Sequence, residues 1–501
     1  MGTRTENANW QKLLPVVLIL LAITASAQTP QVADDATVIE DVTLISPERT
    51  TPLRHAMVVI REGKIAAVGT QAISGPHLHR IDGRGRFLIP GLIDSHVHVG
   101  ASAALDDDAI SAHPDLWKAY RQQAPRAYLA FGFTTVVDVD LKRYDQTWFT
   151  STPLHPHLYT CGRGIKVAGG YGVFQVPAAG SPGFPNLVYE PLEANSWPRT
   201  LDPSDYSAER AVGRAADAGA VCVKAFVETG FGLFHWPYLH DETLREIRRA
   251  ATSRHLKLLV HANALESWQE ALGAHADVIA HGLWIWPGDI TSSAPPSQVS
   301  DVISAVAREH IHVQPTMQAV AGERAFYDKA LLDDPRLTMA LPRSVIAYLS
   351  SPEGEKANKA LLERYQNILP GRPFASTLGT FIARTHETFK LMLRDHVSLI
   401  FGSDTPAADG FGNPPGLNGR LEMQNWADSG ASALLLLRAA TIANAKAMGL
   451  EAELGTIEVG KRADLVLLKK NPLAGVAAYD SIETIFLDGQ PISRETLRGQ
   501  Q

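Results

Sequence analysis

The chain has 501 residues, of which 45% are hydrophobic and 20% charged, an ordinary globular composition. This length is too great for one small domain and suits a large α/β core with a smaller partner domain. The formal net charge of −7 offers no basic surface, so we expect no nucleic-acid partner.

The N-terminal residues have the pattern of an export signal. Arg4 and Lys12 precede an apolar run at 13–24, and small residues follow at 25–27. The apolar run is shorter than the ~20 residues that a bilayer-spanning helix needs. We therefore predict a signal peptide over 1–27, a secreted or periplasmic mature chain, and no stable membrane insertion after cleavage. An uncleaved membrane anchor is the alternative.

Two β-rich segments flank a long middle region. Residues 36–90 contain short β-like runs separated by turn residues, and residues 446–495 repeat this character. Because both ends are β-rich and the region between them is not, we predict that they fold together as one small β-sandwich domain.

The middle region, 91–445, alternates short apolar runs with amphipathic stretches that are typical of helices. The eight apolar runs are 92–99, 134–139, 157–162, 221–226, 257–261, 278–281, 312–316 and 398–404. Strand–helix alternation favours a parallel sheet, and eight units favour an α/β fold of the (β/α)8 TIM-barrel type. An open doubly wound sheet is the alternative. The segment at about 320–390 exceeds one crossover and predicts a helical insertion, which could form a lid, a packing face or the contact of a homo-oligomer.

The chain has two cysteines, Cys161 and Cys222. Cys222 lies two residues before Lys224 in an apolar run, so the two side chains share one face of the predicted strand. Two cysteines do not make a disulfide framework. We expect two buried thiols, with a disulfide as the alternative in an exported chain.

Six polar residues lie in or at the ends of five predicted strands. They are His96, His98, Lys224, His261, His281 and Asp404. In a barrel the carboxyl ends of the strands meet at one face, where the active sites of this fold lie. Neutral imidazole is a good ligand for zinc and related metals. Each residue has an ordinary alternative role in the core, at the rim or as a helix cap, but their coincidence at strand ends favours a metal site.

Lys224 differs from the other five residues because an unmodified lysine does not bind metal ions. An ammonium group is no metal ligand, and a charge in an apolar strand is costly. Burial lowers the pKa of a lysine and frees the amine to react. Reaction with carbon dioxide would give an N-carboxylate that could bridge two cations, so we predict N6-carboxylysine at Lys224. A lysine that reaches water or pairs with a carboxylate is the alternative.

These pieces resemble the amidohydrolase superfamily, in particular its imidazolonepropionase-like and prolidase-like (Xaa-Pro dipeptidase) branch. The matching segments read PGLIDSHVH at 90–98, FGSD at 401–404 and GTIEVGKRADLV at 455–466, together with Lys224, His261 and His281. The resemblance implies two divalent metal ions, zinc foremost. His96, His98 and Asp404 would hold the first ion, His261 and His281 the second, and carboxylated Lys224 would bridge them. Residues 225–230, which follow Lys224, match no characterised subgroup and leave the substrate open.

We therefore predict a hydrolase that cleaves an amide, peptide-like or cyclic amide C–N bond of a small molecule with a metal-bridging hydroxide. Asp404 would move a proton to the leaving nitrogen, and Asp404 and His281 are the predicted catalytic residues. The predicted substrate contacts in the strand-end loops are Tyr171, His235, Tyr238 and Thr316. The alternatives are a metal-dependent lactonase or esterase on the same site and a non-catalytic barrel.

Overall fold

The computed structural model describes residues 36–75, 77–181, 184–368, 371–406 and 410–499. The predicted signal peptide over 1–27 lies outside the described residues. Within the described ranges, no helix combines the length and the apolar character that a membrane span requires.

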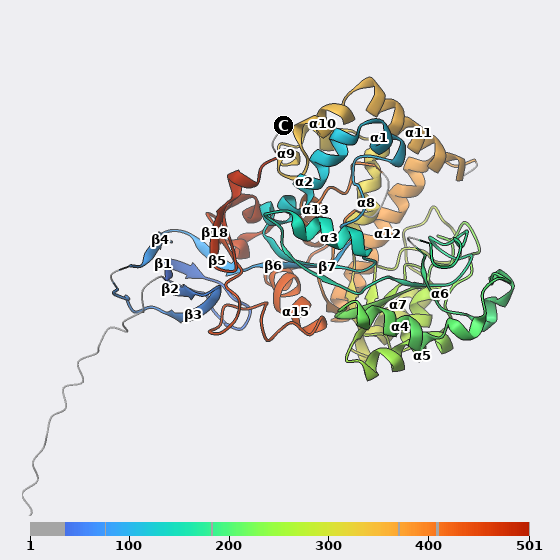
Figure 1. Cartoon of the computed structure of the whole chain (residues 1–501), viewed down its shortest axis with the longest axis horizontal. Helices are drawn as coiled ribbons and strands as arrows, with labels where there is room; N and C mark the ends of the chain where they lie inside the picture. The colour runs from blue at the N-terminus through green and yellow to red at the C-terminus, as the bar shows by residue number, and fades with distance from the viewer. Residues whose placement is uncertain (1–35, 76, 182–183, 369–370, 407–409, 500–501) are drawn as a thin grey trace, which may run out of the picture.

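The N- and C-terminal segments share one eight-stranded sheet, in which the blue and red strands of Figure 1 lie side by side. Its strands are β1 (Thr37–Leu44), β2 (Leu53–Arg61), β3 (Lys64–Gly69), β4 (His79–Asp82), β5 (Phe87–Pro90), β16 (Leu465–Leu468), β17 (Ile482–Leu487) and β18 (Gln490–Ser493). Their order is β18-β17-β16-β5-β1-β2-β3, with β4 also paired to β1. The antiparallel pair β5 and β16 joins the two ends of the chain.

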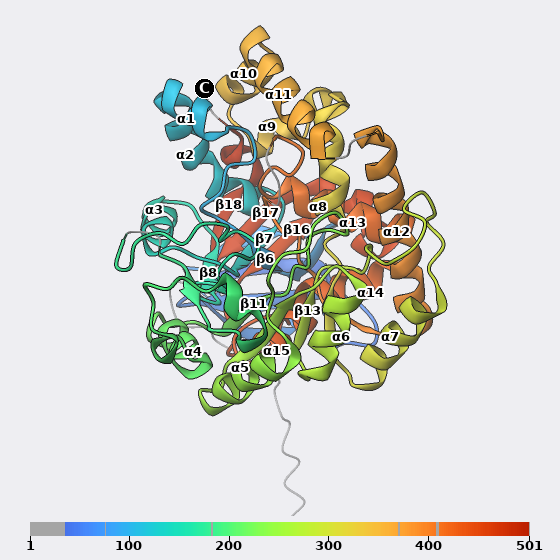
Figure 2. The ribbon, with the colours of Figure 1, turned by 90° about the vertical axis from the view of Figure 1, so that its right-hand side faces the viewer.

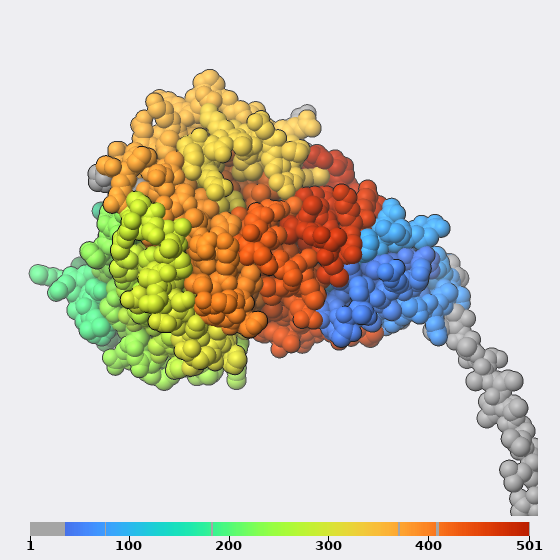
Figure 3. Space-filling model, turned by 180° about the vertical axis from the view of Figure 1, so that it is seen from behind, coloured from blue at the N-terminus to red at the C-terminus, as the bar shows by residue number. Residues whose placement is uncertain are grey.

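Strand β1 changes partner along its length. Its first half pairs in parallel with β4, its last two residues pair with β5, and its register against β2 shifts between Ile39 and Val42. Figure 3 shows the N-terminal strands directly against C-terminal elements at one end of the molecule. The two ends therefore form one connected sheet, and its division into a two-layer sandwich stays a prediction.

The middle region consists of parallel strands covered by helices, which surround the strands in Figure 2. Strands β6 (Leu92–Val97), β7 (Phe133–Asp138) and β8 (His157–Thr160) form a three-stranded sheet. A seven-stranded sheet contains β9 (Ile165–Lys166), β10 (Asn186–Leu187), β11 (Cys222–Phe226), β12 (Lys257–His261), β13 (Val278–Ala280), β14 (His312–Gln314) and β15 (Ser398–Leu399). Every residue of β6, β7 and β11 is buried, as expected for strands covered on both faces.

Backbone hydrogen bonds connect the two parallel sheets at both of their junctions. At one junction, Asp404 N donates to His96 O (2.8 Å) and His98 N donates to Thr405 O (2.7 Å). At the other, Val221 N donates to Thr160 O (2.9 Å). The α/β architecture with parallel sheets is confirmed, but the strand ladder is interrupted at both junctions, so a fully closed barrel is not shown.

The helices between the strands follow the predicted alternation. They are α1 (Asp107–Ala112), α2 (Pro114–Ala130), α3 (Arg143–Ser151), α4 (Ala208–Asp217), α5 (Asp241–Ser253), α6 (Leu265–Gly273), α7 (Ser297–Arg308), α13 (Leu417–Asp428), α14 (Ala433–Arg438) and α15 (Asn444–Ala447). The segment at about 320–390 is also helical. It contains α8 (Met317–Ala321), α9 (Leu337–Ala340), α10 (Arg343–Leu349), α11 (Pro352–Ile368) and α12 (Phe374–Arg394), and α10 packs on α2.

Cys161 and Cys222 form a disulfide, so the expectation of two free thiols is wrong, although both side chains are buried as expected. The bond between Val221 N and Thr160 O draws the end of β8 to the start of β11. The two cysteine Cα atoms consequently lie 4.3 Å apart. The pairing was not evident from the sequence because it depends on which strands are neighbours across a junction between sheets.

An ion-pair cluster ties β8 to the C-terminal strands. His157 Nε2 lies 3.2 Å from Oδ2 of Asp464 and 3.6 Å from Oδ1 of Asp488, and Arg462 Nη1 lies 3.2 Å from the same Asp488 oxygen. Burial alone would lower the pKa of His157. The hydrogen bond to Asp464 and the negative charge of Asp464 have the larger combined effect, so the pKa of His157 is raised. His157, Asp464 and Asp488 could also surround a metal ion. The guanidinium of Arg462 already supplies a cation to this group.

We expect His157→Gln to lower the free energy of unfolding by about 1.5–3 kcal/mol at mildly acidic pH and by less at alkaline pH. The stabilisation is fully present below the unfolded-state pKa of about 6.5 and is lost as the pH rises through the raised folded-state pKa. Urea unfolding at about pH 5.5 and about pH 9 measures the difference. The exposed His79 on β4 offers a matched control, His79→Gln. If His157→Gln lowered the free energy of unfolding equally at both pH values, the raised pKa of His157 in the folded protein would be contradicted.

Candidate metal centre

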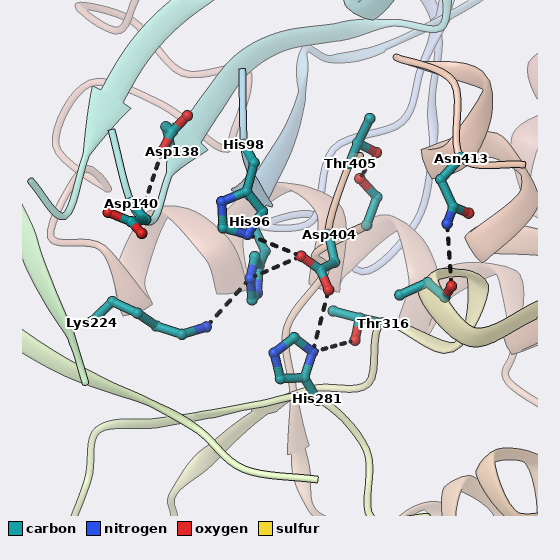
Figure 4. Close-up of polar contacts among 12 residues, drawn as sticks. His96, His98, Asp138, Asp140, Lys224, His281, Thr316, Asp404, Thr405 and Asn413 are labelled. Carbon is teal, nitrogen blue, oxygen red and sulfur yellow. Dashed lines mark hydrogen bonds and ion pairs between the residues drawn. The ribbon is translucent and has the colours of Figure 1, made fainter. Parts of the chain in front are cut away.

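The six predicted side chains meet at the carboxyl ends of the parallel strands, and Figure 4 shows five of them. They line one cavity of about 510 Å³: His96, His98, Lys224, His261, His281 and Asp404. His96 lies in β6, Lys224 in β11 and His261 at the end of β12. His281 follows β13 directly, and Asp404 follows β15. The convergence comes from the parallel arrangement, because all these strands end at the same face.

His96, His98 and Asp404 form the tightest group of donors. Asp404 Oδ1 lies 3.1 Å from His98 Nε2 and 3.4 Å from His96 Nε2. Ligand atoms about 2.1 Å from a tetrahedral zinc ion are about 3.4 Å from one another, so these spacings fit a shared cation. Burial, helped by Lys224, holds the pKa of His96 well below its usual range, which keeps the ring neutral. Burial raises the pKa of Asp404, but the surrounding imidazoles outweigh it and hold this pKa well below the usual value.

Lys224 is fully buried beside this group, and its Nζ lies 3.3 Å from His96 Nε2. Burial lowers the pKa of Lys224 to about 7. Among the described residues, none offers a carboxylate within ion-pair distance of this amine. The alternative of a lysine paired with an acid or extended to water therefore does not hold in this structure.

His261 and His281 form the other side of the cavity, with ring centroids 4.4 Å apart. Burial lowers the pKa of both rings, and that of His281 falls well below its usual range. His281 Nδ1 lies 2.8 Å from Thr316 Oγ1 and 3.6 Å from Asp404 Oδ2. Two neutral imidazoles on adjacent strand ends could hold a second cation beside the first.

The backbone is left-handed at three of these positions: His281 has φ 86°, Asp404 has φ 57° and Thr316 has φ 44°. This conformation is unfavourable for residues with a Cβ and most unfavourable for a β-branched residue such as threonine. Backbone bonds hold two of them, from His281 N to Gln314 O and from Asp404 N to His96 O, each 2.8 Å. Such strain is concentrated at functional sites in folded proteins.

Two residues that support the donors were missed in the sequence. Gln314 ends β14, accepts a bond from His96 Nδ1 (3.1 Å) and donates to Ser95 O (3.0 Å), so it leaves Nε2 of His96 facing the cavity. The buried Glu228 accepts bonds from Gly230 N and Phe231 N (2.8 Å each), and its other oxygen lies 3.2 Å from His261 Nε2. Gln314 carries the same signal as the predicted ligands, a polar residue at the end of an apolar run.

The four predicted substrate contacts divide between two places. Tyr171 lines the cavity, and its ring stacks on His261 with centroids 5.4 Å apart. Thr316 is fully buried and contacts His281. His235 and Tyr238 line a neighbouring pocket that contains none of the six donors.

Charged residues also line the cavity. Asp140 forms ion pairs with Lys166 (Nζ at 2.8 Å) and Arg163 (Nη1 at 3.3 Å). Burial raises the pKa of Asp140, but these two cations outweigh it and the pKa is lowered. Asp138, at the end of β7, accepts a bond from Val99 N (2.7 Å), and burial raises its pKa to about 6. Most of these charged residues are therefore already paired within the protein.

Solved structures show the same fold at low sequence identity. A Xaa-Pro dipeptidase with bound methionine is 20% identical, covers 92% of this chain and 100% of its own, and has a TM-score of 0.63. Molinate hydrolase is 19% identical (93% and 96% covered, TM-score 0.61), and ochratoxinase from A. niger is 18% identical (92% and 96% covered, TM-score 0.61). No curated protein matches the chain at a significant level.

The model of the Amidohydrolase family matches residues 87–492, which is most of the chain. The predicted resemblance is thereby confirmed. The chain belongs to the amidohydrolase family, whose members are hydrolases that act on C–N bonds and generally bind divalent metal ions.

Proposed function

We propose that the chain is an exported, binuclear metal-dependent amidohydrolase on a closed (β/α)8 barrel, and that it cleaves an amide, peptide-like or cyclic amide C–N bond of a small molecule. The observation that carries this proposal is the convergence of four imidazoles, one carboxylate and one buried amine on a single cavity of about 510 Å³. A structural role alone would not bring six such groups from five strand ends into contact.

The donor set fits two divalent ions, with zinc first among the metals that prefer such ligands. His96, His98 and Asp404 would hold one ion, and His261 and His281 the other. N6-carboxylation would turn the buried amine of Lys224 into an anion between them. This change supplies a charge that two cations need, and it explains why the described residues give Lys224 no acidic partner.

Bound divalent ions would supply hydroxide at neutral pH and polarise the scissile carbonyl. Asp404 would accept the proton of the attacking water on a carboxylate oxygen and pass it to the leaving nitrogen as the C–N bond breaks. The products are a carboxylic acid and an amine. His281, fixed by Thr316 and 3.6 Å from Asp404 Oδ2, would keep the carboxylate oriented during this transfer.

Two features support export. The residues at 1–27 have the charge, apolar and small-residue pattern of a signal peptide. The disulfide between Cys161 and Cys222 belongs to the kind of bond that persists in oxidising compartments and is rare in the cytosol.

The first test is metal content. Protein purified with bicarbonate and without chelator is expected to contain about two equivalents of transition metal per chain, measured by inductively coupled plasma mass spectrometry. Chelation should abolish hydrolysis of a panel of N-acyl amino acids, dipeptides and cyclic amides, and added zinc should restore it. Activity on lactones alone would select an ester hydrolase instead. Absence of metal after reloading would refute the proposal.

A further inference from the structure

An aromatic pocket of about 680 Å³ lies beside the metal centre. Most of its walls come from the loops that follow β11 and β13 and from α12. The aromatic side chains that line it are Phe231, Phe234, Trp236, Tyr238, Trp286 and Phe381. Nothing in the reaction described above uses these rings.

Tyr171 connects this pocket to the metal centre. Its ring stacks on His261 on one side (centroids 5.4 Å apart, 25° between planes) and on Trp236 on the other (5.9 Å, 26°). Trp236 in turn stacks on Phe234 (5.3 Å, 6°) and receives the edge of Phe174 (5.0 Å). A continuous row of rings therefore runs from a metal-site histidine to the protein surface.

The outer end of this row is exposed to solvent. Phe174 is 58% exposed, Phe234 is 41% exposed and Leu233 is 37% exposed. Leaving large apolar side chains in water forgoes about 25 cal/mol for each Å² that burial would remove from solvent. Apolar residues gathered at the mouth of an enzyme cavity are typical of a ligand-binding surface.

The polar groups of the pocket argue against an anionic occupant. Arg384 donates to the carbonyl oxygens of Ser292 (2.9 Å), Trp284 (3.2 Å) and Asp289 (2.9 Å), and its guanidinium lies 4.0 Å from the ring centroid of Trp286. The guanidinium of Arg384 is therefore already hydrogen-bonded within the protein. The carboxylates of Glu193 and Glu266 also line the pocket and would repel an acid group.

We propose that this pocket binds a flat, uncharged aromatic group attached to the scissile amide, so that the substrates are aryl-substituted amides rather than small aliphatic ones. The inference rests on the proposed amide hydrolysis at the adjacent metal centre. Phe234, at the exposed end of the row, offers its free ring surface to the aromatic group, and the rings behind it connect the pocket to His261 of the metal centre.

The kinetic test compares matched substrates on the metal-loaded enzyme. N-(2-naphthoyl)glycine is set against N-acetylglycine, and glycine 2-naphthylamide against glycinamide, so that the ring is placed on either side of the bond. We expect kcat/KM to be higher by at least about 10-fold for one naphthyl member of these pairs. Phe234→Ala and Trp236→Ala should remove most of that preference by raising the KM of the naphthyl substrate. The kcat/KM for the small substrates should change little. Tyr144→Ala, at a ring that is 62% exposed on α3 outside the pocket, is the control.

A binding measurement separates this inference from the reaction. Calorimetry with 2-acetylnaphthalene, a ketone that cannot be hydrolysed, should show binding to the wild type and to Tyr144→Ala but at least about 10-fold weaker binding to Phe234→Ala. Hydrolysis of amides without an aryl preference, or without an effect of either pocket variant, would overturn the inference and leave the proposed function standing. Binding that depends on Phe234, in an enzyme that hydrolyses no amide, would support the pocket and refute the proposed function.

Discussion

Replacing Asp404 with asparagine is expected to lower kcat for amide hydrolysis by about 10²–10⁴-fold, the usual contribution of a positioned proton-transfer group. Among the described residues, Asp404 is the one carboxylate that contacts donors on both sides of the cavity. Its Oδ1 lies 3.1 Å from His98 Nε2, and its Oδ2 lies 3.6 Å from His281 Nδ1. Asparagine keeps the shape of the side chain but removes its negative charge and its ability to carry the transferred proton.

The measurement pairs steady-state kinetics with metal content per chain. Asp404→Asn should lose metal as well as activity, because a neutral amide binds divalent ions more weakly than a carboxylate does. Asp138→Asn is the matched control: this buried carboxylate lines the same cavity but bonds to Val99 N and Asp140 N. The control should keep its metal. If Asp404→Asn retained both metal and full hydrolysis, the site would be misassigned.

The sequence predicted the convergence of the six donors because a single rule governs it. Parallel strands end at one face, so polar residues at the ends of apolar runs meet even when they are 308 residues apart, as His96 and Asp404 are. The same rule would have found Gln314, whose partner is His96. Glu228 was missed because its role depends on the bonds that its two oxygens make within a loop.

Features that depend on neighbours across the fold could not be predicted. The disulfide of Cys161 and Cys222 requires β8 and β11 to lie side by side, a relation that apolar periodicity does not encode. His235 and Tyr238 were placed on the correct loop, but the course of that loop turns them into the aromatic pocket and not toward the metal centre. Strand-end positions are fixed by the sheet, whereas loop side chains depend on local packing.

Replacing Lys224 with alanine is expected to reduce bound metal to about one equivalent or less and to lower kcat/KM by at least about 10³-fold, because the bridging anion would be lost together with its place between the two ions. The substitution opens space beside His96, since Lys224 is fully buried and its Nζ lies 3.3 Å from His96 Nε2. A short carboxylate such as acetate or propionate can enter that space and supply the missing oxygens. Added propionate should therefore restore part of both the metal content and the activity.

Two further measurements make this prediction specific to carboxylation. Wild-type enzyme prepared with ¹³C-bicarbonate should show a carbamate carbon resonance that is missing from Lys224→Ala. Lys166→Ala removes another lysine of the same cavity, one that is paired with Asp140 at 2.8 Å, and should keep its metal and gain nothing from propionate. A Lys224→Ala enzyme that still bound two equivalents of metal would show that carboxylated Lys224 is not needed to hold the two ions. In that case the burial of Lys224, with its pKa near 7, would need a different explanation, such as proton transfer to substrate.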